Sequence, residues 1–162
     1  MMHLVDANVL IEAKNRYYAF DIAPGFWDWL DRAHHRGEAC SIDAVREELM
    51  EGDDALADWA RTNAGFFRSI DQGSQRHFRA LTAWAYSRNY TQAALAEFAS
   101  DQADFLLIAF AREHQHVVVT HEQSHPDAQK RVYIPDACQA MGVRTANTFQ
   151  MLRAIGAKLD LR

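Results

Sequence analysis

The sequence predicts an α/β fold in which a parallel sheet of about four or five strands is flanked by helices. Short runs rich in β-branched residues alternate with longer segments of helical periodicity, and Gly, Pro and capping residues separate them. Strands spaced by helices favour a parallel sheet, because each right-handed helical crossover lets the next strand run in the same direction as the previous one. The 162 residues show no internal repeat, low-complexity run or linker, so we expect a single domain over residues 1–162.

Three strands and four helices are expected in the first half of the chain. The expected strands are 3–5, 38–42 and 66–70. The expected helices are 9–18, 24–37, 43–52 and 53–65. Pro24 stands at the favoured first turn of its helix, and Gly37 closes that helix. Asp43 or Ser41 can cap the helix that follows the second strand.

The second half is expected to be mainly helical. The expected helices are 75–89, 92–99, 102–115, 136–143 and 147–157, and the expected strands are 116–120 and 131–135. Ser74 and Thr91 are the candidate N-caps of the first two helices, and Ser100 or Asp101 of the third. Segment 102–115 contains "FLLIAFA", which is too apolar for an exposed helix, so we expect it to pack against the sheet.

Composition excludes several classes of protein. The longest apolar runs are too short to cross a bilayer, and the start "MMHLVDANVL" lacks the basic region of a signal peptide. Cys40 and Cys138 form no CxxC pattern, which favours buried reduced thiols in a cytoplasmic protein. The net charge of −5 argues against coating nucleic acid by bulk electrostatics, but it leaves room for a local basic strip beside an acidic site.

Four acidic residues fall at comparable places in this scheme. Asp6 ends the first strand, and Glu122 lies just beyond the strand 116–120. Glu48 and Asp104 stand on helices that could face the same edge of the sheet, where parallel α/β folds bind ligands. Clustered carboxylates raise one another's pKa unless a cation is present, and oxygen ligands suit Mg²⁺ or Mn²⁺. For each acid alone, helix capping or a solvated face is the simpler interpretation.

The residues around these acids resemble the PIN-domain nucleases. The resemblance rests on "VDANVLIEA", "AVREEL", "ADFLLIAFA" and "VVVTHE", which follow in the family's order over residues 2–125. In addition, "DANVLIEAKNRYYAFDIAPGFWDWL", "IPDAC" and "NTFQMLRAIGA" are similar to a PIN-like subgroup of bacterial proteins. The resemblance implies a PIN-like fold and a metal site formed by Asp6, Glu48 and Asp104. It places Glu122 at the fourth position, where the family usually has aspartate.

Three further acids compete for these places. Asp136 in "IPDAC" is an alternative fourth donor, although capping the helix that follows it is a simpler role. Asp101 lies three residues before Asp104, and N-capping suits it better. Glu47 is the rival of Glu48, but the family's glutamate stands directly before leucine, which favours Glu48.

Supporting roles are expected for five other residues. Asn8 and Glu12 are one helical turn apart beside the first acid, where they could orient a metal-bound water. Thr120 corresponds to a family threonine or serine that hydrogen-bonds a ligating carboxylate. Lys14 and Arg16 in "KNRYY" could hold RNA phosphates while the tyrosines stack on unpaired bases, or the group could be a partly packed helix end.

The segment "HEQSH" (121–125) matches the zinc-protease pattern H-E-x-x-H. That site needs both histidines on one helix, at positions i and i+4. His125 precedes Pro126, and residues before proline avoid the helical region. We therefore interpret the match as accidental and His121 and His125 as loop residues.

The sequence thus predicts a cytoplasmic, Mg²⁺- or Mn²⁺-dependent endoribonuclease. The resemblance also implies the toxin of a toxin–antitoxin pair, with RNA as substrate and a small antitoxin and a second copy of the chain as partners. An alternative is a catalytically degenerate PIN-like module that binds RNA or protein. A phosphatase of the haloacid-dehalogenase type is a weak third candidate, because it needs a second acid where this chain has Asn8.

Overall fold

Five short parallel strands form the centre of the molecule. They are β1 (His3–Val5), β2 (Ala39–Ile42), β3 (Phe67–Arg68), β4 (Val117–Val119) and β5 (Thr145–Ala146). Their order in the sheet is β3-β2-β1-β4-β5, and Leu4 of β1 pairs with Cys40 of β2 and with Val118 of β4. The chain therefore builds outward from β1 in one direction and then in the other, so the switch point lies between β1 and β4.

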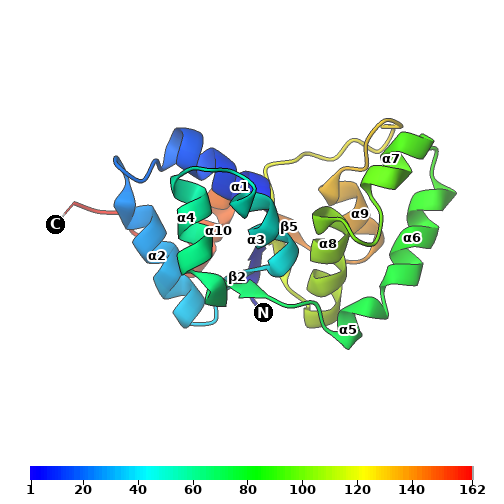
Figure 1. Cartoon of the computed structure of the whole chain (residues 1–162). Coiled ribbons are helices and arrows are strands. Elements are labelled where there is room, and N and C mark those ends of the chain that lie inside the picture. Colours follow the sequence, from blue (N-terminus) through cyan, green and yellow to red (C-terminus); the bar gives the residue numbers. More distant parts are fainter. Residues whose placement is uncertain (162) are drawn as a thin grey trace.

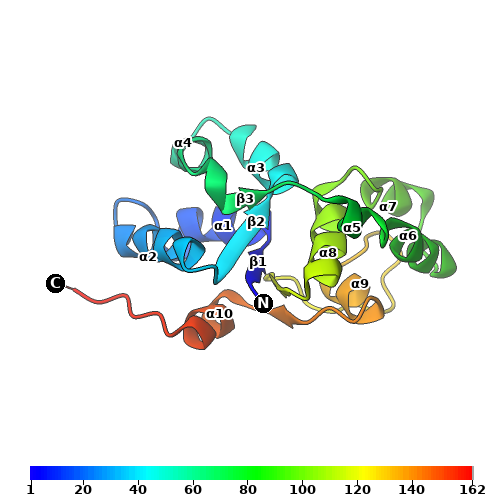
Figure 2. The ribbon, with the colours of Figure 1, turned by 90° about the horizontal axis from the view of Figure 1, so that it is seen from below.

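Helices occupy both sides of this sheet in the computed structural model, which describes residues 1–161 (Figures 1 and 2). On one side of Figure 1 lie α1 (Ala7–Glu12), α2 (Pro24–His35), α3 (Asp43–Met50), α4 (Ala55–Thr62) and α10 (Thr148–Ile155). On the other side lie α5 (Gln72–Gln75), α6 (Phe78–Ser87), α7 (Gln92–Glu97), α8 (Ala103–His114) and α9 (Ile134–Ala140). A π-helix, η1 (Ala13–Tyr17), continues α1, and a short 3-10 helix, η2 (Ala64–Phe66), precedes β3. Among residues 1–161, no helix combines the length and apolarity needed to span a membrane.

The expectation of a parallel α/β fold is confirmed, and α8 is buried as its composition predicted. Phe105, Leu107 and Ile108 of α8 are fully buried beside the equally buried β4. Burial of each such side chain contributes about 1.5–3 kcal/mol to the free energy of folding. Cys40 and Cys138 are buried and unbonded, and burial raises the pKa of the Cys40 thiol to about 12.

The expected strand at 131–135 is wrong. Residues 131–133 form no strand, and Ile134 with Pro135 begins α9. Proline is well suited to the first turn of a helix because it has no N–H to donate there. The fifth place in the sheet is taken instead by the two-residue β5, which pairs with β4.

Several expected caps are also wrong, and the two side chains expected to cap α3 make tertiary contacts instead. Ser41 donates a 2.6 Å hydrogen bond to the carbonyl of Val5 in the neighbouring strand, and Asp43 accepts one from the Ser69 hydroxyl. Ser74 lies inside α5. The backbone before α8 is capped at Gln102 without a side-chain hydrogen bond, so neither Ser100 nor Asp101 serves as its cap. Thr91 does cap α7 as expected, accepting from the N–H of Ala94 at 3.2 Å.

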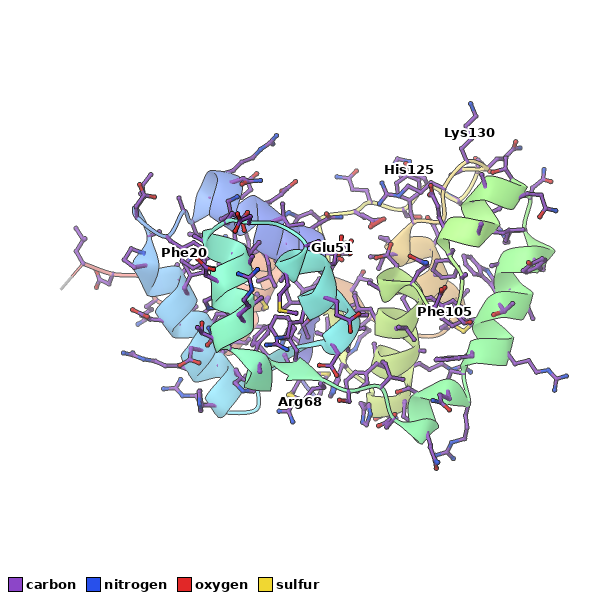
Figure 3. All side chains as sticks on the ribbon, viewed as in Figure 1. Phe20, Glu51, Arg68, Phe105, His125 and Lys130 are labelled. Atoms are coloured by element: carbon purple, nitrogen blue, oxygen red, sulfur yellow. The ribbon has the colours of Figure 1, made fainter. Side chains whose placement is uncertain are left out.

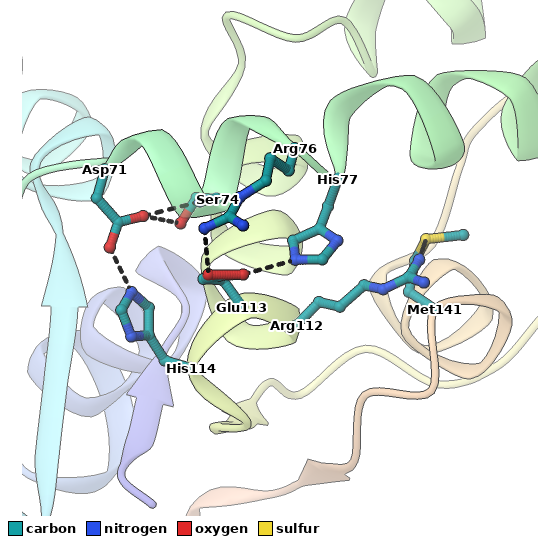
Figure 4. A network of polar contacts seen from close by, with 8 residues as sticks. All are labelled: Asp71, Ser74, Arg76, His77, Arg112, Glu113, His114 and Met141. Carbon is teal, nitrogen blue, oxygen red and sulfur yellow. Dashed lines mark hydrogen bonds and ion pairs between the residues drawn. The ribbon is translucent and has the colours of Figure 1, made fainter.

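A polar network holds α5 and the start of α6 against the outer face of α8 (Figure 4). His114 lies 2.6 Å from Asp71, the N-cap of α5, and His77 lies 3.0 Å from Glu113. A Cβ atom at Gly73 would overlap the Glu113 carboxylate, so a larger residue there would have to displace that side chain from the network. These contacts fix the helix whose first turn carries Asp104.

Helix α10 begins with a capping box that also sets the position of Thr148. Asn147 Oδ1 accepts from the N–H of Gln150 and its own N–H donates to Gln150 Oε1, both at 2.8 Å. We predict that Asn147→Ala lowers the free energy of unfolding in urea by about 1 kcal/mol. The exposed Asn89→Ala, which removes no side-chain hydrogen bond of the described structure, is the control and should change it by less than about 0.5 kcal/mol. Equal effects of the two substitutions would contradict the capping role.

Candidate functional site

Asp6 lies at the switch point of the sheet, directly after β1. Its N–H donates to the carbonyl of Val119 at 3.0 Å, and its side chain is almost completely buried. The Thr120 hydroxyl donates to Asp6 Oδ2 at 3.1 Å, which confirms the expected contact of this threonine with a carboxylate. Burial first, and then the charges of Asp104 and Glu122, raise the pKa of Asp6 to about 8. The hydrogen bond from Thr120 opposes this shift but does not outweigh burial and the neighbouring acids.

Glu122 approaches the same place from the loop after β4. The Thr120 hydroxyl also accepts from the N–H of Glu122 at 3.1 Å, so one threonine fixes both acids. Glu122 Oε1 accepts from the N–H of Ile134, whereas Oε2 is buried without a hydrogen bond, 3.3 Å from the guanidinium of Arg131. Burial raises the pKa of Glu122 while Ile134 and Arg131 oppose the shift.

Glu48 and Asp104 complete the group from α3 and α8. Asp104 is partly buried in the first turn of α8, and burial raises its pKa while Arg131 lowers it. Glu48 has an exposed side chain, yet the surrounding protein and the charge of Asp104 still raise its pKa. Glu48 also contributes to the raised pKa of Asp6, so the four predicted acids act on one another electrostatically. We call Asp6, Glu48, Asp104 and Glu122 the acid site.

An open cleft of about 540 Å³ lies beside the acid site, between α3, α7 and the start of α8. Six of its lining residues are acidic: Glu47, Glu48, Glu51, Glu97, Asp101 and Asp104. Arg131 is the one cationic residue among those lining it in the described structure. Figure 3 labels Glu51, which lies between the two groups of helices on the α3 side of this cleft. The cleft gives a ligand direct access to the two helix-borne members of the acid site.

The chemistry of the acid site fits a hard divalent cation. Its donors are carboxylate oxygens, one of them a buried oxygen of Glu122 that no hydrogen bond satisfies, and Asp6 is charged only at a cost. The four carboxylates lie near one another but do not form a ready coordination shell. Within residues 1–161, no three His, Cys, Asp or Glu side chains are already arranged around a cation position. The exposed Glu48 can reorient, whereas Asp6 and Glu122 are held by Thr120.

Asp136 and the supporting residues have contacts of their own. Both oxygens of the buried Asp136 are engaged, Oδ1 by the Ser124 hydroxyl at 2.6 Å and Oδ2 by the N–H of His125 at 2.9 Å. It thereby fixes the loop that carries Glu122, and the charge of Glu122, unlike that of Asp136, is among those that raise the pKa of Asp6. Lys14 forms a 2.8 Å ion pair with Asp54. The other supporting residues are Asn8 and Arg16, which are exposed, and Glu12, which contacts a histidine.

That histidine is His121, and its contacts explain the "HEQSH" segment. Residues 121–125 form no helix, so the two histidines do not share a helical face. His121 Nδ1 lies 2.7 Å from Glu12 Oε2 and Nε2 lies 2.6 Å from Thr148 Oγ1, so both ring nitrogens are already used. His125 is exposed and packs its ring against Tyr133. The sequence alone did not indicate the roles of Arg131 and Thr148, because no local sequence pattern signals the contacts through which they meet Glu122 and His121.

The raised pKa of Asp6 predicts a distinctive pH dependence. Between its usual value of 3.8 and about 8, the folded state holds a proton that the unfolded state releases, so stability falls as pH rises through this window. In EDTA, we therefore expect the free energy of unfolding of the wild type to fall relative to that of Asp6→Asn as pH rises from 4.5 to 8. The difference in favour of Asp6→Asn should reach at least about 1 kcal/mol at pH 8. Urea unfolding of Asp6→Asn and of the exposed Asp21→Asn checks this, and identical pH profiles for both would contradict it.

Comparisons with known proteins agree with this architecture. A family model described as "Domain of unknown function (DUF4411)" matches residues 3–159. The comparison with curated proteins found no match. Among solved structures, the crystal structure of VapBC2 from Rickettsia felis bound to a DNA fragment from their promoter is similar, with a TM-score of 0.59. The identity is 11%, and the match covers 91% of this chain and 98% of that chain, which shows a shared PIN-like fold. The chain therefore has a PIN-like fold and belongs to the DUF4411 family.

Proposed function

We propose that this protein is a metal-dependent ribonuclease whose acid site holds Mg²⁺ or Mn²⁺. The observation that carries the proposal is the buried Asp6 at the switch point, whose pKa three other carboxylates help to raise. A protein keeps such an arrangement at a cost in stability, which a bound cation would offset. Asp6, Glu48, Asp104 and Glu122 would be its ligands.

The cation and the side chains of the protein would have separate roles in the reaction. When bound, the cation would supply Lewis-acid stabilisation of a phosphodiester displacement and lower the pKa of the attacking water. Thr120 would keep Asp6 and Glu122 oriented through its two hydrogen bonds. Arg131, half exposed at the cleft and 3.3 Å from Glu122, is placed to neutralise a substrate phosphate as it enters.

The structural likeness extends the proposal to partners. The similar structure is named as VapBC2 bound to a fragment of promoter DNA. We infer by analogy that this chain acts as a toxin-type ribonuclease in the cytoplasm, restrained by a small antitoxin and able to pair with a second copy of itself. The analogy rests on the fold alone, so antitoxin and dimer are to be tested separately from the chemistry.

A specific observation favours the second candidate, a PIN-like module that binds without cutting. Arg131 already provides a positive charge beside Glu122, and Glu122 is longer than the aspartate expected at its position. An internal cation of this kind can replace a metal in a degenerate site. The two candidates differ in one respect, because only the nuclease requires a divalent cation to change its substrate.

Cleavage of end-labelled RNA tests the proposal. Purified protein is incubated with a mixture of single-stranded and structured RNA in Mg²⁺, Mn²⁺ or EDTA, beside Asp6→Asn and the exposed control Asp21→Asn. We expect metal-dependent cutting that EDTA abolishes and that Asp6→Asn reduces by at least about 100-fold, since even residues behind a metal ligand contribute 10–100-fold. Asp21→Asn should cut like the wild type.

Each other outcome has a definite meaning. Cutting that survives Asp6→Asn would place the chemistry elsewhere and contradict the acid site. RNA that is bound but never cut, under either metal, would favour the binding module. Pull-down with the chain as bait would then identify its macromolecular partner.

A further inference from the structure

Two exposed aromatic side chains, Tyr17 and Phe149, lie in contact with each other. The side chains of Tyr17 and Phe149 remain 52% and 43% exposed, and their ring centroids are 6.0 Å apart at 84°, an edge-to-face pair. They come from segments far apart in the sequence, the end of η1 and the first turn of α10. Exposed aromatic side chains that gather in this way mark binding sites more often than isolated ones do.

The backbone of η1 is arranged so that Tyr17 faces outward. Residues 13–17 form a π-helix, and the N–H of Tyr18 returns to the carbonyl of Ala13 at 2.6 Å. Tyr18 then turns inward and stacks on Phe26, with centroids 4.4 Å apart and rings nearly parallel. π-Helical segments are rare and frequently occur at functional sites. The wider π-helical turn thus lets Tyr18 pack inward while the adjacent Tyr17 stays exposed to solvent.

His121 connects this pair to the acid site. Its ring lies 6.4 Å from that of Tyr17, edge to face, and is fixed by Glu12 of α1 and Thr148 of α10. His121 stands in the chain between Thr120, which holds Asp6, and Glu122. The aromatic pair therefore adjoins the carboxyl edge of β4, on which the acid site also lies.

We propose that Tyr17 and Phe149 form a subsite that stacks an unpaired nucleobase of an RNA strand whose backbone crosses the acid site. The subsite rests on the proposed function, since it gives the ribonuclease its preference for single-stranded RNA. A pair of rings suits one base, and stacking on aromatic rings needs no particular sequence. Arg16, exposed beside Tyr17 and without an ion pair in the described structure, provides the charge that a flanking phosphate requires.

Binding of RNA in EDTA, where no cutting is expected, tests the subsite by fluorescence anisotropy. The probes are a fluorescent oligouridylate of about six nucleotides and an abasic strand of the same length. We expect Tyr17→Ala and Phe149→Ala each to weaken oligouridylate binding about 10-fold, and Tyr17→Phe to stay within about 2-fold of the wild type. The abasic strand should bind all of these proteins equally. Tyr86 of the distant α6 is even more exposed, so Tyr86→Ala is the control and should match the wild type.

The opposite results would overturn the subsite. These are unchanged binding by Tyr17→Ala, equal losses for both strands, or no RNA binding by the wild type. A shift from dimer to monomer in Tyr17→Ala, with RNA binding unchanged, would instead identify the pair as a contact between copies of the chain. Failure of the nuclease is distinguishable, because base-dependent binding through Tyr17 without any cleavage would leave the subsite in place.

Discussion

The buried carboxylate of Asp6 is the constraint on which the rest of the site depends. A carboxylate that loses water must be neutral, hydrogen-bonded or paired with a cation. Asp6 has one hydrogen bond, from Thr120, while the charges of three other acids raise its pKa. The fold puts it there unavoidably, because β1 is the central strand and Asp6 is the first residue beyond it. The buried carboxylate therefore lowers the stability of the fold at the switch point between β1 and β4.

The surrounding structure holds this arrangement from several directions. Thr120 ties the ends of β1 and β4 together, and Asp136 fixes the loop through which Glu122 approaches. The network around Asp71 and Glu113 anchors α8 from outside, so that Asp104 is presented by a rigid helix. Glu48 alone has an exposed, adjustable side chain. The acid site thus combines acids held by the surrounding structure with one whose side chain is free to reorient.

Much of the fold could be predicted from local signals, because those signals are strong here. The apolar run of β4, Pro24 and Gly37 around α2, and the capping residues of α10 are each specified by neighbours in the sequence. The predicted strand at 131–135 failed because the preference of Pro135 for a helix start competed with a β-like composition. The cap at Ser41 failed because its hydroxyl donates to the distant carbonyl of Val5. The cap at Ser74 failed because Asp71, three residues earlier, caps α5 and also accepts from the Ser74 hydroxyl.

The acid site could also be predicted from local signals, but only in part. Each of its members stands beside a strand end or in a recognisable helix, so the topology brings them to one edge. Arg131, the His121 contacts and the outward turn of Tyr17 were not predictable. Arg131 meets Glu122 across an irregular loop, and His121 contacts residues tens of positions away. The π-helical turn that presents Tyr17 has no local signature. Long-range polar contacts are thus the part of this site that only a structure reveals.

Calorimetric titration of the metal-free protein with Mn²⁺ at pH 7.5 tests the central claim most directly. With the pKa of Asp6 at about 8, binding of the cation should release protons, visible as a dependence of the heat on the buffer. Asp6→Asn should abolish this binding, whereas Glu97→Gln, which removes a cleft acid outside the acid site, should preserve it. If Mn²⁺ does not bind, or binds equally well without the Asp6 carboxylate, the acid site is not a metal site.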